Sequence, residues 1–150
     1  MSNSAKENGG MLGRVLMTIS VLMYGAVPPF VDITQTHLLN PEWPPHARLH
    51  MSWLLMTNGS IGLLCLCLLW MSGDRASSRI GLAGILGTCV LGGFFVSAAT
   101  MPFYGGSLTD PGGVVPVNGV DGNLVAFGLA FVLLVLGWML ALRGRSETRP

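Results

Sequence analysis

The three histidines of this 150-residue chain all lie in one short stretch that runs from His37 to His50. His46 and His50 are four residues apart and directly follow Pro44 and Pro45. Proline suits the start of a helix because its missing N–H would have no partner there. If a helix begins at these prolines, both imidazoles lie on one face about one turn apart. Two imidazoles placed in this way can chelate one metal ion.

Two residues that precede the histidine pair could complete a metal site. Asp32 and His37 follow the first apolar segment of the chain. Three imidazoles and one carboxylate suit Zn²⁺, Cu²⁺ or non-haem Fe²⁺, and the sequence does not choose among these ions. We therefore predict a transition-metal site formed by Asp32, His37, His46 and His50. A coordination position left open for water or substrate would let the ion act on a small lipophilic molecule that enters from the bilayer.

Four further side chains are candidates for contacting such a substrate. Trp43 and Trp53 would wall the site, and Arg48 would orient an anionic group. Asn58 lies about two turns below His50, and polar side chains at membrane depth normally face the interior of a bundle. Asn58 could therefore line a cavity, and ordinary hydrogen bonding between helices is the alternative.

The histidine stretch also allows two interpretations without a metal. One is metal-free catalysis or binding of a polar ligand, and the other is an interfacial cap that holds loop carbonyls and lipid headgroups. The sequence leaves these interpretations open, and it does not establish whether the protein is an enzyme. On the last long loop, Asp110 precedes a proline and Asp121 precedes a glycine, which is typical of turn and cap residues.

The elements that must position these residues are four apolar segments. Of all residues 51% are hydrophobic and only 10% are charged, whereas a soluble domain has roughly a quarter charged residues. Each segment approaches or exceeds the ~20 residues that a membrane-spanning helix needs, and lipid tolerates no unpaired backbone groups. The sequence predicts an all-α, polytopic membrane four-helix bundle in one domain, residues 1–150. The segments lie at about 11–31, 53–71, 80–101 and 124–142, and residues 1–10 and 143–150 are expected to form flexible cytoplasmic tails.

The positions of the basic residues predict an orientation in the membrane. With four crossings, seven of the eight Lys and Arg residues fall on the side that holds both termini, and only Arg48 falls on the other. The positive-inside rule then places both termini in the cytoplasm and the histidine loop outside it, in a plasma or inner membrane. The seven residues are Lys6, Arg14, Arg75, Arg79, Arg143, Arg145 and Arg149.

Composition and missing motifs argue against several classes of ligand. The net charge of +1 and the lack of a basic stripe argue against nucleic acid. The chain has no phosphate-cradling glycine loop, no dinucleotide fingerprint and no C-x-x-C-H motif, so we expect neither a nucleotide nor covalent haem. Cys65, Cys67 and Cys89 all lie in apolar segments and are interpreted as small buried hydrophobic side chains.

Small residues in the third apolar segment indicate where helices could approach one another closely. Gly84, Thr88 and Gly92 recur every four residues, and the fourth segment carries Ala126 and Ala130. Contact within the bundle is the first interpretation, and a homo-oligomer or a larger membrane complex is the second. In the second case the chain would be a non-catalytic subunit. A third hypothesis is a metal-free binder of a lipid or quinone.

The stretch from His37 to His50 resembles a signature, HLxNPxWPPHARxH, of a small family of four-helix integral membrane proteins that is known as a domain of unknown function. The resemblance covers these fourteen residues and the number of helices. It implies a four-helix membrane fold and supplies no activity. Four-helix membrane folds that bind or isomerise sterols are similar in architecture alone.

Overall fold

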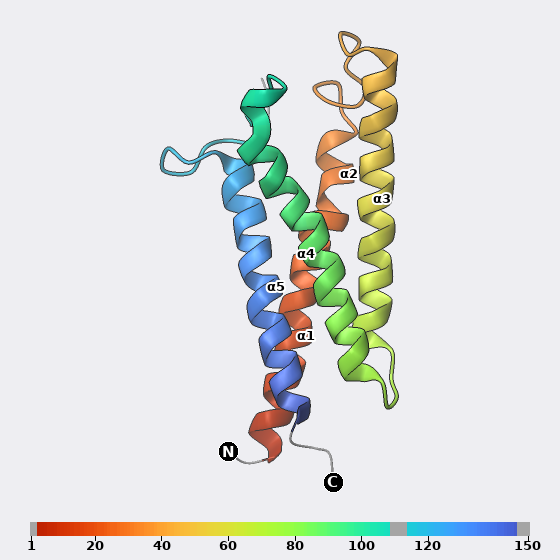
Figure 1. Cartoon of the computed structure of the whole chain (residues 1–150), viewed down its shortest axis with the longest axis vertical. Helices are drawn as coiled ribbons and strands as arrows, with labels where there is room; N and C mark the ends of the chain where they lie inside the picture. Colours follow the sequence, from red (N-terminus) through yellow and green to blue (C-terminus); the bar gives the residue numbers. More distant parts are fainter. Residues whose placement is uncertain (1–2, 109–113, 147–150) are drawn as a thin grey trace.

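The secondary structure of the computed structural model, which describes residues 3–108 and 114–146, is helical apart from one isolated β-bridge between Val117 and Val120. The predicted all-α class is therefore confirmed. Figure 1 shows the helices in order along the chain. They are α1 (Asn3–Gly25), α2 (Val27–Asp32), α3 (Pro45–Trp70), α4 (Ala76–Thr100), the short 3₁₀ helix η1 (Met101–Phe103) and α5 (Gly122–Ser146).

Four helical stretches are long and apolar enough to cross a membrane. They have 25, 26, 28 and 23 residues, so at about 1.5 Å per residue each exceeds the ~30 Å hydrocarbon core. Large apolar side chains cover their outer faces, as in a protein whose solvent is lipid. The chain is thus a multi-pass integral membrane protein. The four stretches are Asn8–Asp32, Pro45–Trp70, Ala76–Phe103 and Gly122–Gly144.

The first span is broken near its end by two prolines. α1 ends at Gly25, and α2 carries Pro28 and Pro29 close to its start. Neither proline has an N–H to donate to the preceding turn, and a proline ring crowds the carbonyl four residues earlier. The single apolar segment predicted for residues 11–31 therefore forms two helices in sequence.

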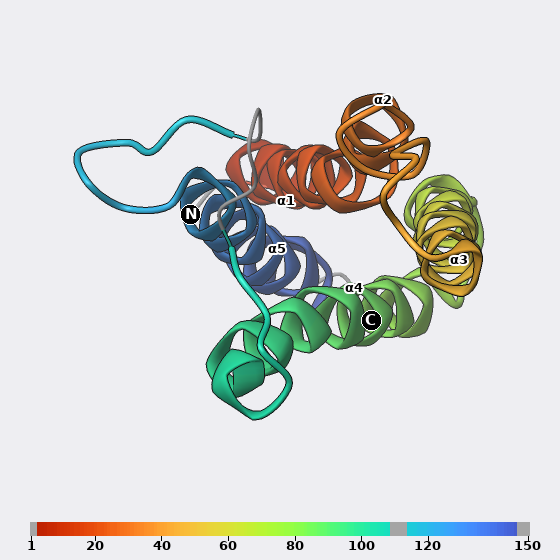
Figure 2. The same ribbon diagram turned by 90° about the horizontal axis from the view of Figure 1, so that it is seen from above.

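The four spans alternate in direction and form a ring in the order α1, α3, α4, α5 (Figures 1 and 2). Within the part of the chain that the structure describes, α3 contacts α1 and α4 but not α5. One end of the bundle holds the beginning of α1, the end of α5 and the α3–α4 loop. The opposite end holds the α2–α3 loop, η1 and the α4–α5 loop, so the histidine stretch lies at the end farther from the first residues of α1.

α1 and α5 touch backbone to backbone. A Cβ atom built on Gly13 would lie 2.6 Å from the carbonyl oxygen of Gly137 and would overlap the backbone of Ala141. A Cβ atom on Gly137 would lie 2.7 Å from the carbonyl oxygen of Gly13. Near the middle of this contact, the buried hydroxyl of Ser20 donates a hydrogen bond of 2.7 Å to the carbonyl of Ala130. Glycine is therefore required at both positions, and the sequence analysis did not single them out.

The small residues predicted to form a contact face on α4 have different surroundings from one another. Gly84 is buried under the indole of Trp138, because an added Cβ atom would lie 2.5 Å from Cε2 of that ring. The hydroxyl of Thr88 donates to the carbonyl of Gly84 in its own helix at 2.8 Å. A Cβ atom on Gly92 would meet nothing within 4 Å. Contact within the bundle, the first interpretation, thus accounts for Gly84. A homo-oligomer through Gly84, Thr88 and Gly92 stays a prediction.

Two smaller expectations concern the first residues of the chain and the cysteines. Residues 3–10, expected to lie in a flexible tail, are the first turns of α1, and a Cβ atom on Gly10 would lie 3.8 Å from the Cα atom of Gly144. The α1–α5 contact therefore continues to that point. The expected tail residues 1–2 and 147–150 lie outside the described residues. Of the three cysteines only Cys65 is buried, while Cys67 and Cys89 are exposed on the surface of the bundle.

Candidate functional site

The histidine pair is positioned by the start of α3. Pro44 is the residue before the helix and Pro45 is its first residue, as the sequence indicates. The backbone N–H of Arg48 donates to the carbonyl of Pro44 at 3.2 Å, which closes the first turn. His46 and His50 therefore occupy the first and second turns of a regular helix.

The two imidazoles converge on one another. The Nε2 atoms of His46 and His50 are 3.0 Å apart and form a hydrogen bond in which either nitrogen can be the donor, and the ring planes are nearly perpendicular at 87°. Both side chains are exposed. Two imidazole nitrogens that are each ~2.0–2.1 Å from one ion are about 2.9 Å apart at a right angle and about 3.4 Å apart at the tetrahedral angle. The observed separation falls within this range.

Asp32 and His37 form a second pair at the same end of the bundle. Asp32 is the last residue of α2, and the chain turns directly after it, because the N–H of Leu38 donates to the carbonyl of Asp32 at 3.0 Å. His37 Nε2 lies 4.0 Å from Asp32 Oδ1, and both side chains are 22% exposed. His37 Nδ1 lies 2.8 Å from the hydroxyl of Thr36. The ring of His37 is thus held from two sides.

The structure brings the four predicted ligands together as two pairs. Among the described residues, 3–108 and 114–146, no group of three or more His, Cys, Asp or Glu side chains is close enough to hold a metal ion. The four-ligand site formed by Asp32, His37, His46 and His50 therefore stays a prediction. The two pairs belong to different elements, and only the tertiary arrangement of the α2–α3 loop decides how near they come.

Each pair has a tryptophan beside it. The rings of Trp43 and His37 are 6.3 Å apart at an interplanar angle of 67°, and those of Trp53 and His50 are 6.0 Å apart at 24°. Trp53 is 65% exposed, so its indole faces the surroundings of α3. Arg48 is half-buried in the turn between the two histidines of α3. Substrate contacts of Trp43, Arg48 and Trp53 stay a prediction.

The α4–α5 loop lies at the same end of the molecule. Asp121 Oδ1 accepts a hydrogen bond of 2.8 Å from the N–H of Asn123, so this carboxylate caps the start of α5. Asn118 and Gly119 have positive φ angles and form the turn of the small Val117–Val120 bridge. The cap and turn interpretation of Asp121 is therefore confirmed. Asp110 lies outside the described residues.

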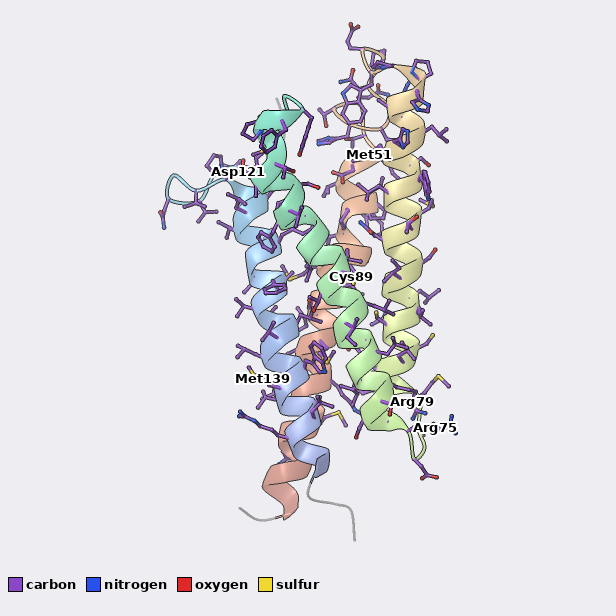
Figure 3. The ribbon with its side chains drawn as sticks, in the orientation of Figure 1. Met51, Arg75, Arg79, Cys89, Asp121 and Met139 are labelled. Atoms are coloured by element: carbon purple, nitrogen blue, oxygen red, sulfur yellow. The ribbon has the colours of Figure 1, made fainter. Side chains whose placement is uncertain are left out.

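The opposite end of the bundle carries arginines in place of histidines. Figure 3 shows Arg75 and Arg79 at the α3–α4 loop, far from Met51 and Asp121 at the other end. Arg79 Nη2 donates to the carbonyl of Met71 at 2.9 Å and to that of Gly73 at 3.3 Å. These bonds hold the tight connection between α3 and α4 in place.

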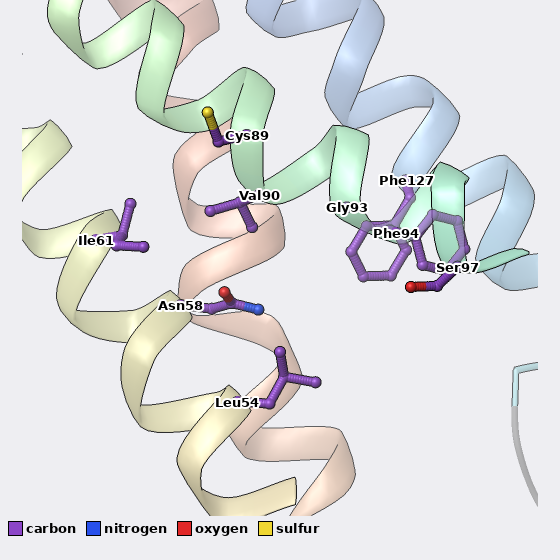
Figure 4. Close-up of a pocket in the computed structure, with 9 residues that line it drawn as sticks. All are labelled: Leu54, Asn58, Ile61, Cys89, Val90, Gly93, Phe94, Ser97 and Phe127. Carbon is purple, nitrogen blue, oxygen red and sulfur yellow. The ribbon is translucent and has the colours of Figure 1, made fainter. Parts of the chain in front are cut away.

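A cleft with a volume of about 480 Å³ begins at Leu54, one helical turn after His50 along α3. Figure 4 shows the residues that line it. Asn58, predicted from the sequence as a candidate lining residue, lines this cleft together with an aromatic wall that was not predicted. No sequence signal could have found that wall, because its two phenylalanines lie on different helices. Its lining includes Asn58 and Ile61 of α3, Cys89, Phe94 and Ser97 of α4, and Phe127 of α5.

Comparison of the chain with protein families, curated proteins and solved structures finds no match. The family resemblance of the His37–His50 stretch is therefore not supported by a family assignment. What is established is the class: an all-α integral membrane protein with four spans. Any function must be argued from the site itself.

Proposed function

We propose that this chain is a multi-pass membrane protein that binds one transition-metal ion at its histidine-bearing end, with His46 and His50 as the first two ligands. The observation that carries the proposal is the 3.0 Å separation of the two Nε2 atoms on the surface of a regular helix. Because the backbone of α3 fixes both side chains one turn apart, little ordering is needed when an ion binds.

The remaining coordination positions have candidates at the same end. Asp32 and His37 supply a carboxylate and an imidazole that already lie 4.0 Å apart. Water fills any position that these residues do not reach, and a position held by water is open to substrate. An ion in such a site polarises a carbonyl group or lowers the pKa of its bound water.

The start of a helix is not by itself favourable for a cation. The partial positive charge of the α3 N-terminus opposes the ion by about 0.3–1 kcal/mol at an exposed position. A complete four-ligand zinc site has an apparent binding free energy of about 10–16 kcal/mol. The unfavourable energy from the helix N-terminus is small even compared with half of this binding free energy. The number of ligands, and not the helix N-terminus, therefore decides the affinity for the metal ion.

Metal titration of the purified protein in detergent tests the proposal. We expect one ion per chain, with Cu²⁺ bound more tightly than Zn²⁺, as the order of divalent metals predicts for an imidazole site. His46→Ala and His50→Ala should each weaken binding at least about tenfold, since loss even of a residue that only hydrogen-bonds to a metal ligand costs about 10–100-fold.

His37→Ala is the matched control, because it also removes one imidazole but leaves the α3 pair intact. Unchanged affinity in this variant would restrict the site to the pair, and a loss equal to that of His46→Ala would support the larger predicted site. A wild-type protein that binds neither Cu²⁺ nor Zn²⁺ in a one-to-one ratio would refute the proposal.

We further infer that the histidine-bearing end faces away from the cytoplasm. The support is the positive-inside rule together with the position of Arg75 and Arg79 at the other end of the bundle. In a cysteine-free background, His46→Cys should react with a membrane-impermeant maleimide added to intact cells, and Arg75→Cys should not. The reverse pattern would invert the orientation.

A further inference from the structure

The cleft between α3 and α4 lies at the depth of the hydrocarbon core. Asn58 is midway along α3, which runs from Pro45 to Trp70 as one membrane-spanning helix. On α4 the cleft extends from Cys89 to Ser97, which is about 12 Å along the helix axis. Cys89 and Ser97 are exposed, so the cleft is open to the surroundings of the bundle, which at this depth are lipid.

An amide with no partner points into this cleft. Figure 4 shows the side chain of Asn58 directed away from α3 into the space toward α4. The side chain of Asn58 is half-buried and makes no hydrogen bond to any residue of the described ranges 3–108 and 114–146. An amide can donate two hydrogen bonds and accept others, and leaving them unmade in hydrocarbon is costly. A polar residue retained at this depth is expected to serve a ligand or a water-filled cavity.

The rest of the cleft is apolar and partly aromatic. Phe94 of α4 and Phe127 of α5 stack at a centroid distance of 4.2 Å and an interplanar angle of 14°. They form a flat wall beside the cleft (Figure 4). No charged side chain is among the described lining residues, and Ser97 adds one hydroxyl near the outer end. The chemistry of the lining therefore favours a neutral molecule with a flat apolar part and a hydrogen-bonding group.

The residues of α3 that line the cleft project toward the same side of the helix as His50. At 3.6 residues per turn, Leu54, Asn58 and Ile61 all project within about 80° of the direction of His50. Leu54 lines the cleft one turn, roughly 6 Å, below His50. A molecule in the cleft would thus lie next to the turn of α3 that carries His50.

We propose that this cleft binds a neutral, ring-bearing lipophile with a carbonyl group, such as an aryl ketone or a quinone ring. The amide N–H of Asn58 donates to the carbonyl, and the ring packs against Phe94. A volume of about 480 Å³ holds a ring system with a short chain, and a longer chain extends into the bilayer. The inference rests on the proposed function for the role of this lipophile as the substrate, whereas its binding needs no metal.

Photolabelling of the full-length protein in lipid nanodiscs with 4-dodecylbenzophenone tests the inference, because this probe carries both the aryl ketone and the apolar chain. We expect saturable adducts on residues of the cleft, mapped by mass spectrometry, and competition by a decyl-substituted benzoquinone but not by dodecane. Asn58→Leu should weaken labelling about 3- to 10-fold, as expected for the loss of one hydrogen bond.

Two neighbouring glycines provide a matched pair of variants. Gly93 lines the cleft and Gly92 does not, while an added Cβ atom at either position meets nothing within 4 Å. Gly93→Leu should therefore abolish saturable labelling, and Gly92→Leu should leave it unchanged. Equal loss in both variants, or adducts spread evenly over all four spans in the wild type, would overturn the proposal.

The labelling is performed in the presence of a chelator and repeated with His46→Ala, so that its outcome is independent of the metal site. If His46→Ala loses metal binding but keeps saturable labelling, the result would support ligand binding in the cleft and show that this binding does not depend on the histidine pair. Metal binding without saturable labelling would refute the cleft and leave the metal proposal standing.

Discussion

The α1–α5 contact and the α3–α4 contact use glycine for opposite purposes. At Gly13 and Gly137 the missing side chain lets two helices touch, and an added Cβ atom would lie within 2.8 Å of backbone atoms of the facing helix. At Gly93 the missing side chain leaves space, because an added Cβ atom would meet nothing within 4 Å. In lipid, packing holds helices together, so the first contact stabilises the bundle and the second leaves a cleft.

Polar side chains show the same difference between the two contacts. Ser20 is fully buried between α1 and α5, and its hydroxyl donates to the carbonyl of Ala130 at 2.7 Å. Asn58 lies at the α3–α4 cleft, and within the described part of the chain its amide has no hydrogen-bond partner. The polar group at the close α1–α5 contact, the Ser20 hydroxyl, is therefore hydrogen-bonded, whereas the Asn58 amide at the open α3–α4 contact is not. The comparison teaches that the two contacts differ in packing: the α1–α5 contact is close, whereas the α3–α4 contact leaves the space in which we propose that a ligand binds.

Substitution in the tight contact should have the largest effect. Gly13→Ala places a Cβ atom against the backbone of Gly137 and Ala141, and neither helix can move aside without losing the contact. We expect the free energy of unfolding to fall by about 3 kcal/mol, the upper part of the range for overpacking. Reversible unfolding in mixed SDS and dodecylmaltoside micelles measures this change.

Gly92→Ala is the control for that experiment, because the open space at Gly92 leaves only the higher helix propensity of alanine. It should be neutral or slightly stabilising. If Gly13→Ala were as well tolerated as Gly92→Ala, the distinction between a tight and an open contact would be wrong.

Removal of the buried hydroxyl should have an intermediate effect. Ser20→Ala deletes the hydrogen bond from α1 to the Ala130 carbonyl, which keeps its own partner within α5. The expected loss is about 1 kcal/mol of unfolding free energy, a usual net value for such a bond. The same micelle titration measures it, and Thr100→Ala, whose hydroxyl bonds within its own helix, serves as the control.

Replacement of the unpartnered amide should have the smallest effect on stability, with the opposite sign. Asn58→Leu removes no hydrogen bond within the described protein and substitutes a better helix former, so we expect a gain of about 0.5 kcal/mol. A loss of more than 1 kcal/mol in this variant would mean that Asn58 has a structural role, which would contradict its assignment to a ligand. The measurement is made on the same preparation as the photolabelling.

Much of the fold could be predicted because it depends on local properties. The number of spans follows from the length of the apolar segments, and the start of α3 follows from Pro44 and Pro45. The relation between His46 and His50 follows in turn, since residues four apart in any helix are neighbours. The cap at Asp121 was visible for the same reason.

The glycine contacts could be predicted only in part. The spacing of Gly84 and Gly92 drew attention to α4, but the closest approach lies between Gly13 and Gly137. The small pair at Gly137 and Ala141, four residues apart, carried the same signal and was overlooked. Spacing shows that a helix has a small face, and it does not show which other helix lies against it.

From the sequence by itself come the membrane class, the four helices and the geometry of the histidine pair, because each depends on residues close together along the chain. The tertiary structure alone decided that Asp32 and His37 form a pair of their own, that α1 packs against α5, and that Phe94 and Phe127 meet beside Asn58. The Asp32–His37 pair depends on how the chain turns directly after α2, and the other two relations join residues on different helices. In lipid the fit of whole helix surfaces, rather than a pattern within one of them, determines which surfaces meet.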